Sequence, residues 1–346
     1  MKKSQDSRFF SIDLFSGCGG LTQGMSDAGF QTKVAVELEE DAVKAFKLNH
    51  PDTQVIQKDI REISVDEIKS VLGDQRLHLL AGCPPCQGFS RVRRLNKAQC
   101  VDDDRNNLVE EYYRLVEGLM PYTIMMENVP GLEEYSLFQE IVKNLRNLGY
   151  KIEHKVVDVK KYGVPQSRRR LIMVGSLLGQ LNIAEGSQKK VTVRKKIEHL
   201  PTPDATDDPM QKIVANHSDR IMERIKKTPK DGGSWKDLPE EYILDCHKKK
   251  NVGFNDIYGR LRWDDYSTTI TGGCLNPSKG RFLHPEQDRV ITPREAALLQ
   301  SFPEDYKFPT DIAKSSLALL IGNALPPEFS RIHSDNIARH LSEHLN

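Results

Sequence analysis

The sequence predicts an α/β fold with a doubly wound, mostly parallel sheet and a smaller, irregular second domain. Three features of the chain predict this fold. A strand, a glycine-rich turn and a helix open the sequence, short apolar runs then alternate with helical segments up to residue 175, and the alternation stops between about residues 176 and 289. Strands that alternate with helices form parallel sheets, because each helix returns the chain to the same end of the sheet.

Composition limits the class of protein. The chain has 346 residues and a formal net charge of +1, so a nucleic-acid partner would have to bind a local basic face. No apolar run reaches membrane-spanning length, and the N-terminus shows no signal-peptide pattern. The six cysteines are scattered and form no disulfide framework. We therefore expect a soluble protein of a reducing compartment that does not bind membranes.

The first motif indicates a nucleotide site. Residues 8–15 form a predicted strand that ends in Ser16-Gly17-Cys18-Gly19-Gly20, and a helix is expected over 21–28. Glycines at such a turn let the backbone approach a ligand. The next strand, 33–36, ends at Glu37, where a carboxylate can accept hydrogen bonds from ribose hydroxyls. The pattern predicts an adenosine-type cofactor, although a glycine turn alone can be a simple tight turn.

A third strand ends at another acid. Residues 41–49 are typical of a helix and residues 54–57 of a strand, which is followed by Lys58 and Asp59. Asp59 is placed where a carboxylate could accept a hydrogen bond from an adenine amino group. It could equally be a helix N-cap or a turn residue.

The strand predicted over 77–81 leads into Gly82-Cys83-Pro84-Pro85-Cys86-Gln87-Gly88-Phe89-Ser90. The prolines restrict the backbone before Cys86, and a rigidly held cysteine after a buried strand suits a nucleophile. A redox pair or half a zinc site would also contain this C-x-x-C spacing, and Cys86 could be merely structural. The following residues, 91–105, are expected to form a loop that can contact a phosphate backbone.

Two further segments bring charged residues to strand ends. A helix over 106–118 precedes a strand over 122–126, which ends at Glu127. Helix 137–148 and strand 152–159 follow. Because side chains alternate along a strand, Arg168 and Arg170, which precede the strand 171–175, should share one face and Arg169 the other. The three arginines could instead be a solvated edge or a phosphate patch.

These polar residues share one location in the predicted fold. The glycine turn, Glu37, Asp59, Cys86 and Glu127 all follow the carboxyl ends of predicted parallel strands. Open α/β sheets bind ligands along that edge. The sequence therefore predicts a single site there.

The region from 176 to 289 predicts a second domain. It has basic loop segments such as 226–233, with short strands expected over 258–263 and 267–271. Such a surface suits phosphates and base edges, although charge runs are often only solvated faces. After it, Thr292-Pro293-Arg294-Glu295 has the pattern of a capping box with proline at the first helical position, and helices should follow over 315–321 and 328–344.

Taken in order, these segments resemble the bacterial type of the cytosine-C5 DNA methyltransferase family. The resemblance implies a Rossmann-like methyltransferase fold that binds S-adenosylmethionine. It also implies a catalytic and cofactor-binding domain at 1–178, a target-recognition domain at 179–288, and C-terminal helices at 289–346 that return to the catalytic domain. The matching motifs are residues 13–20, 84–90, 127–129, 166–170, 294–303 and 322–324.

The resemblance implies a role for each catalytic residue. The Cys86 thiolate would add to C6 of a flipped-out cytosine, and Glu127 would bind the N3 and amino edge of the base. Arg170 would reach the base O2, and Arg168 would support the loop. Cys83 and Cys18 have no role in the family mechanism.

The cofactor site implied by the resemblance contains seven residues. Phe15 would stack against adenine, Glu37 would hold the ribose and Asp59 would receive the adenine amino group. The others would line the pocket: Gly17, Gly19, Leu108 and Asn323.

The resemblance also bears on partners. It implies a monomer that acts on double-stranded DNA in the cytoplasm, associated with the nucleoid, and that can have a cognate restriction endonuclease. Two alternatives are a tRNA cytosine-C5 methyltransferase and a DNA-binding relative without catalysis. The tRNA branch carries a Cys-Phe-Thr signature, which this sequence lacks, and the intact Cys86 and Glu127 argue against loss of catalysis.

Overall fold

The chain folds into two compact units. Unit 1 comprises residues 1–162, 169–187 and 325–346, and unit 2 comprises residues 163–168 and 188–324. These limits differ from the three-part division expected from the sequence, since 289–324 belong to unit 2 and only the last segment returns to unit 1. The computed structural model describes residues 9–73, 75–85, 108–187, 189–248 and 256–345.

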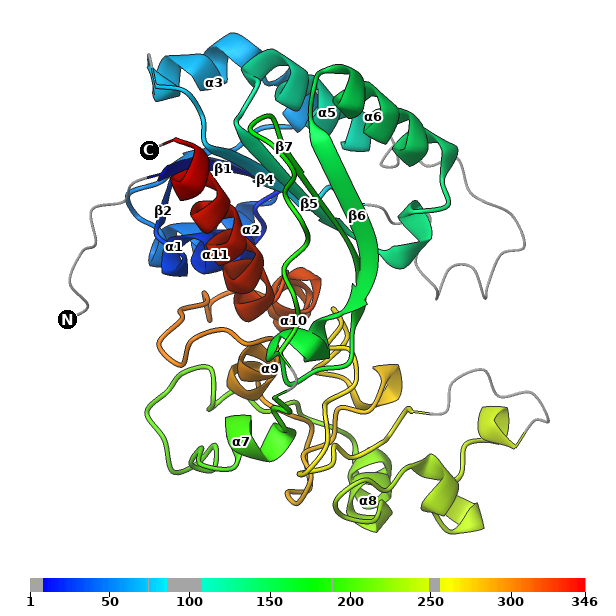
Figure 1. Ribbon diagram of the computed structural model, residues 1–346. Helices are drawn as coiled ribbons and strands as arrows, with labels where there is room; N and C mark the ends of the chain where they lie inside the picture. The colour runs from blue at the N-terminus through cyan, green and yellow to red at the C-terminus, as the bar shows by residue number, and fades with distance from the viewer. Residues whose placement is uncertain (1–8, 74, 86–107, 188, 249–255, 346) are drawn as a thin grey trace. The chain divides into compact units, whose positions relative to one another are not determined.

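Unit 1 contains a seven-stranded sheet in the order β3-β2-β1-β4-β5-β7-β6 (Figure 1). Neighbouring strands from β3 through β5 pair in parallel, and β7 lies antiparallel to both β5 and β6. The prediction of a doubly wound, mostly parallel sheet is therefore confirmed. The strands are β1 Phe9–Leu14, β2 Phe30–Val36, β3 Gln54–Ile56, β4 Leu79–Gly82, β5 Thr123–Asn128, β6 Lys151–Asp158 and β7 Arg169–Ser176.

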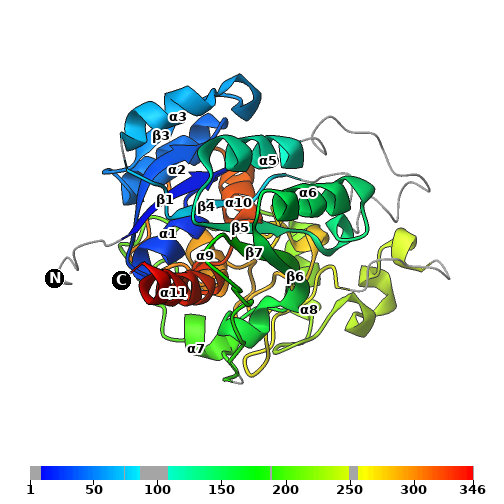
Figure 2. The same cartoon turned by 45° about the horizontal axis from the view of Figure 1, so that its top comes forward.

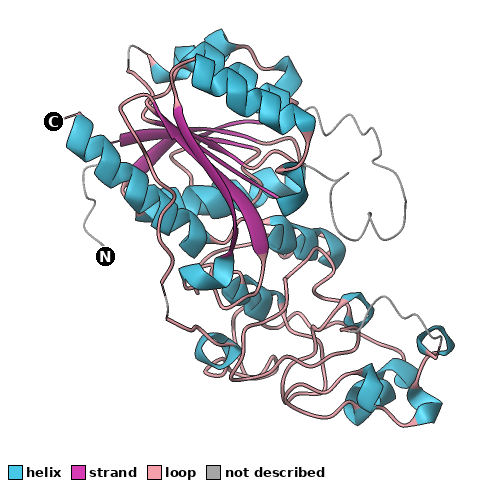
Figure 3. Ribbon diagram, turned by 45° about the vertical axis from the view of Figure 1, so that its right-hand side comes forward, coloured by secondary structure: helices cyan, strands magenta, loops and turns pink. Residues whose placement is uncertain are grey.

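Helices cover both faces of this sheet (Figure 3). Right-handed crossovers place α1 and α2 on one face while the chain moves outward from β1 to β3. From β4 on, the chain adds strands on the other side of β1. The helices α3, α5 and α6 therefore cover the other face of the sheet (Figure 1). The α-helices among the described residues of unit 1 are α1 Gly20–Asp27, α2 Glu40–Asn49, α3 Val65–Leu72, α5 Leu108–Leu119, α6 Ser136–Asn147 and α11 Pro327–His344.

The main core lies between the sheet and α3, α5 and α6. It is built from fully buried side chains such as Ile12, Leu80, Ile124 and Phe138. Burying one such side chain stabilises the fold by about 1.5–3 kcal/mol. Tyr112 is also fully buried, and its hydroxyl donates to the carbonyl of Met125 at 3.1 Å, so this polar group needs no water.

The last helix, α11, packs beside the first helix, α1, although some 300 residues separate them in the chain; Figure 2 shows the two together. Gly24 makes this close packing possible, because a Cβ there would lie 2.4 Å from the Cβ of Ser330. The Ser330 hydroxyl donates to the carbonyl of Leu21 at 2.8 Å. The C-terminal segment is therefore an integral layer of unit 1.

Unit 2 is mainly irregular. Where the structure describes this unit, its α-helices are α7 Val193–Ile197, α8 Asp219–Lys227, α9 Pro293–Leu299 and α10 Lys314–Asn323. The capping box predicted at the start of α9 is confirmed, because the Thr292 hydroxyl accepts from the Glu295 amide and the Glu295 carboxylate accepts from the Thr292 amide. None of the described helices in either unit is long and apolar enough to cross a membrane.

The prediction of strands over 258–263 and 267–271 is wrong. The described residues there form only isolated bridges, such as Arg260 with Leu283 and Ser267 with Gln166. The backbone there bonds to scattered loop segments: the amides of Arg260 and Leu261 donate to the carbonyls of Gly233 and Leu283. The fully buried Arg260 side chain joins further loops, because its guanidinium donates to four carbonyls, those of Ile225, Thr228, His284 and Gln287.

Candidate active site

The glycine turn after β1 leaves an open space. Gly17 and Gly19 have φ angles of 54° and 91°, which L side chains rarely adopt. A Cβ at Gly17 would meet no atom within 4 Å. The amide of Gly19 donates to the carbonyl of Ser16 at 2.9 Å, which closes the turn at the start of α1. Phe15 also has a positive φ, of 61°, so the turn is shaped by its whole backbone rather than by glycine alone.

Asp13 is a buried acid beside this turn that sequence reasoning missed as a site residue. It is fully buried, and its Oδ2 accepts from the Thr22 hydroxyl at 2.6 Å. Among the described residues its Oδ1 has no hydrogen-bond partner. The pKa of Asp13 is raised from 3.8 to about 7, mainly by burial; the hydrogen bond from Thr22 opposes this rise and the nearby Glu37 carboxylate adds to it. The signal in the sequence was a carboxylate inside an apolar strand.

Glu37 is oriented by three backbone amides. Its Oε2 accepts from Gly17 at 2.7 Å, and its Oε1 accepts from Leu38 at 2.8 Å and from Glu39 at 2.9 Å. A carboxylate has about four acceptor directions. The geometry therefore joins the end of β2 to the glycine turn and leaves one direction on Oε2 for a further donor.

Asp59 follows β3 and is held by a single arginine. Its Oδ1 accepts from the backbone amide and the Nε of Arg61, both at 3.0 Å, and its Oδ2 accepts from Nη2 at 2.6 Å. The side-chain hydrogen bond from Arg61 lowers the pKa of Asp59 to about 2. The carboxylate therefore stays ionised near neutral pH and can accept from a ligand donor. It is also the N-cap of a short 3-10 helix, as the alternative interpretation proposed.

Glu127 forms a buried ion pair at the end of β5. Arg170 Nε lies 2.7 Å from Glu127 Oε1, and the two side chains are only 15% and 11% exposed. The pairing of β5 with β7 brings the two residues together across the sheet. The guanidinium of Arg170 holds the Glu127 carboxylate in a fixed orientation. This arrangement suits the recognition of a planar group with donors on one edge.

The residues just after β4 lie beside this ion pair. Gly82 is paired with Met126 in the sheet, so Cys83 and Glu127 follow neighbouring strand positions. Asn128 donates from its side-chain amide to the carbonyl of Pro84 at 2.8 Å. This bond ties the end of β5 to the segment that precedes Cys86.

Cys83 is a free thiol. Burial, and then the Glu127 carboxylate, raise the pKa of Cys83 well above its usual range. A thiol with a raised pKa is a poor nucleophile at neutral pH. Cys86 itself lies outside the described residues.

Arg168 belongs to a buried network in unit 2. Its Nη1 donates to the carbonyls of Ile270 at 2.8 Å and Gly322 at 2.9 Å. Gln166 donates to Gln300 Oε1 at 2.8 Å, and Gln300 donates to the carbonyl of Ile321 at 2.7 Å. Three sequence motifs distant in the chain, at 166–170, 294–303 and 322–324, are joined by these bonds.

The shared strand face expected for Arg168 and Arg170 stays a prediction, because β7 begins at Arg169 and Arg168 precedes it. Arg168 therefore lies before the strand, in unit 2, whereas Arg170 lies within it, in unit 1.

The structure thus brings some of the predicted residues together within unit 1. Gly17 and Glu37 are in direct contact, as are Glu127 and Arg170. Leu108, the first residue of α5, packs against the main core, and Asn323 ends α10 in unit 2.

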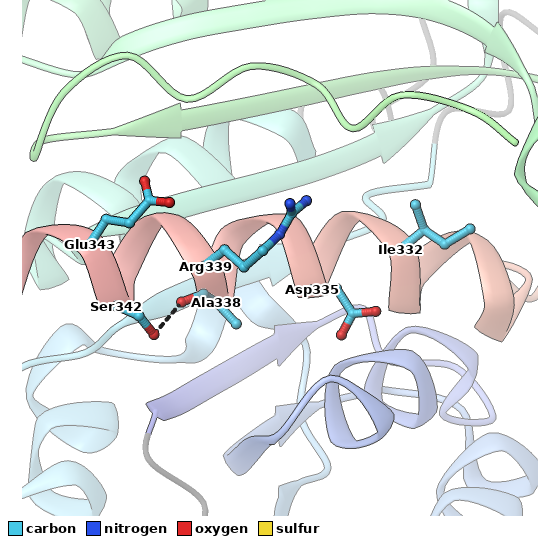
Figure 4. Close-up of a pocket in the computed structure, with 6 residues that line it drawn as sticks. All are labelled: Ile332, Asp335, Ala338, Arg339, Ser342 and Glu343. Carbon is cyan, nitrogen blue, oxygen red and sulfur yellow. Dashed lines mark hydrogen bonds between the residues drawn. The ribbon is translucent and has the colours of Figure 1, made fainter.

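A surface hollow along α11 is separate from these residues (Figure 4). All the side chains that line it belong to that one helix, and none is a predicted site residue. They are Ile332, Asp335, Ala338, Arg339, Ser342 and Glu343.

Comparisons with known proteins agree on one family. The family model for C-5 cytosine-specific DNA methylase matches residues 9–339. The type II methylase M.HgiDII of Herpetosiphon aurantiacus is 34% identical over 343 residues, which cover 95% of each chain. The type II methyltransferase M1.HphI of Haemophilus parahaemolyticus is 33% identical over 323 residues, which cover 91% of this chain and 83% of that protein.

A solved structure supports the same conclusion. It is the crystal structure of a protein described as a DNA modification methyltransferase encoded within a prophage of E. coli. That chain is 27% identical in sequence, with a TM-score of 0.75, and the match covers 96% of this chain and 99% of the other. Our chain therefore belongs to the C-5 cytosine-specific DNA methylase family and is a DNA (cytosine-5-)-methyltransferase.

Proposed function

We propose that the protein transfers a methyl group from S-adenosylmethionine to carbon 5 of a cytosine that is flipped out of a specific double-stranded DNA site. A transient covalent bond to Cys86 activates the base. The observation that supports this most strongly is the buried Glu127–Arg170 ion pair, which lies at the end of β5 beside the strand that leads into Cys86.

The residues divide the chemistry between them. Carbon 5 of cytosine is a poor nucleophile until the Cys86 thiolate adds to C6. Glu127, held by Arg170, would bind the N3 and amino edge as electrons move into the ring, and Arg170 would reach O2 with its remaining donors. Arg168 would support the preceding loop through the carbonyls it bonds. After methylation, loss of the C5 proton expels the Cys86 thiolate and restores the ring.

The described residues fit an adenosine cofactor at the glycine turn. Bound S-adenosylmethionine would supply the electrophilic methyl group. The open space at Gly17 and the remaining acceptor direction on Glu37 suit a ribose, and the ionised Asp59 suits an adenine amino group. Phe15 would stack on the adenine. The pocket would be completed by Gly19, Leu108 and Asn323.

DNA binding would depend on clustered cations rather than on net charge. Flipping the base costs roughly a few kcal/mol, which pocket contacts offset. The basic loops of unit 2 are the proposed recognition surface, and duplex affinity should fall steeply with salt. We further propose a cytoplasmic, nucleoid-associated monomer. The type II names of its relatives support a modification role beside a restriction endonuclease.

The decisive experiment is covalent trapping on a duplex that contains 5-fluorocytosine. Cys86→Ala should abolish trapping while cofactor binding persists. The matched control is Cys83→Ala, which removes the neighbouring thiol and should leave trapping intact. Trapping that survives in Cys86→Ala would remove Cys86 from its proposed role.

A further inference from the structure

One short segment of unit 2 is closely packed and hydrogen-bonded although it is irregular. The residues around Arg262 are nearly inaccessible: Arg260 is fully buried, Leu261 is 1% exposed and Trp263 is 4% exposed. The amide of Leu261 donates to the carbonyl of Leu283 at 2.9 Å. The amide of Trp263 donates to Asp231 Oδ1 at 2.7 Å. Arg262 is the exposed residue in the middle of this fixed backbone.

A glycine makes room for the Arg262 side chain. A Cβ at Gly232 would lie 2.4 Å from the Nε of Arg262 and 2.7 Å from its Cγ, so the arginine stem lies directly against that backbone. The loop around Gly232 is itself anchored, since Arg281 Nη1 donates to the carbonyls of Gly232 at 2.9 Å and Gly233 at 3.1 Å. The direction of the side chain is therefore set by the fold rather than left to solvent.

The neighbouring carboxylates bond to groups other than Arg262. Asp231 Oδ1 accepts from the Trp263 amide, and both oxygens of Asp264 accept from Arg194, at 2.7 and 3.0 Å. No described residue forms an ion pair or hydrogen bond with the guanidinium of Arg262. Most other described arginines of unit 2 do have carboxylate partners, namely Arg194, Arg260, Arg281, Arg289 and Arg294.

A held but unpaired guanidinium has a specific chemical use. Its parallel donors match the O6 and N7 acceptors of guanine in the major groove, which is the commonest base-specific contact in protein–DNA complexes. A contact to a phosphate of the DNA backbone needs only charge. Recognition of a base needs the fixed orientation that Gly232 and the buried neighbours provide.

We propose that Arg262 is a specificity-determining residue that reads a guanine in the DNA site this enzyme methylates. The inference rests on the proposed function, since it requires that the enzyme methylates a defined duplex site. It goes further by naming one base of that site and the side chain that recognises it.

The test measures sequence preference on duplexes with a randomised site, read by bisulfite sequencing. The unsubstituted enzyme should require guanine at one position of the site. Both Arg262→Ala and Arg262→Lys should reduce the preference for guanine at that position by about tenfold or more. All other positions should keep their preference. Lysine keeps the charge but loses the paired donors, so it separates geometry from charge. Gly232→Ala, which leaves the charge of Arg262 in place but displaces its stem, should relax the same position.

The matched control is Arg220→Ala, at an exposed arginine of α8 in the same unit. It should weaken binding to all duplexes alike and leave the preferred site unchanged. An unchanged preference in Arg262→Lys, or a uniform loss over all positions in Arg262→Ala, would overturn the proposal. Absence of C5 methylation by the unsubstituted enzyme would instead refute the proposed function, so the two failures are distinguishable.

Discussion

Asp13→Asn tests whether the buried acid beside the glycine turn destabilises the fold when it is ionised. Asparagine has nearly the same shape, and its side-chain oxygen can still accept from the Thr22 hydroxyl, which now donates to Asp13 Oδ2 at 2.6 Å. Its amide nitrogen would replace an oxygen that has no partner among the described residues. That unsatisfied donor should cost about 1–3 kcal/mol at every pH.

The pH dependence has a definite sign. Burial raises the pKa of Asp13 from 3.8 to about 7, so the folded protein binds a proton that the unfolded chain releases between these values. Stability must therefore fall as pH rises from about 4 to 7, by up to about 4 kcal/mol for a shift of about three pKa units. Asparagine lacks this penalty. The variant should be less stable than the unsubstituted protein at pH 4 and more stable at pH 8.

The assay is urea unfolding followed by far-UV circular dichroism from pH 4 to 8. Fluorescence would be unsuitable, because both tryptophans, Trp235 and Trp263, lie in unit 2. Ser11→Ala is the matched control, since it removes a buried, non-titrating hydroxyl from the same strand. A difference between Asp13→Asn and the unsubstituted protein that stays constant over this pH range would refute the reasoning.

Two further predictions concern the cofactor pocket and the packing of helices. Arg61→Ala should weaken binding of S-adenosylhomocysteine about two- to fivefold in calorimetry and reduce its preference over the inosine analogue, because Asp59 loses its orienting partner. Lys58→Ala removes the adjacent cation and should leave that preference intact; an unaltered preference in Arg61→Ala would contradict the role of Asp59. Gly24→Ala should lower stability by about 1–3 kcal/mol, because its Cβ would lie 2.4 Å from Ser330, and an unchanged melting temperature would disprove this.

Much of unit 1 could be predicted from local patterns. Each strand from β1 to β5 coincides with an apolar run of the sequence. The polar residues after these strands lie at the carboxyl edge of the sheet, because parallel strands end on the same side. A local pattern also predicted the start of α9, since a capping box needs only Thr292 and Glu295 three residues apart. In unit 2 this reasoning failed at 258–263, where the backbone bonds to separate loop segments, such as those of Gly233 and Leu283, instead of to one continuous strand.

The sequence by itself therefore determined which chemical groups the protein has and on which strand ends they lie, because strand and turn signals extend over only a few residues. Tertiary structure alone decided which of them are partners. Glu127 meets Arg170 only because β5 and β7 pair antiparallel, whereas Arg168, two residues earlier, belongs to unit 2 and bonds to carbonyls of that unit. Asp13 acquires its raised pKa from burial. Such effects depend on residues distant in the chain, and no local pattern encodes them.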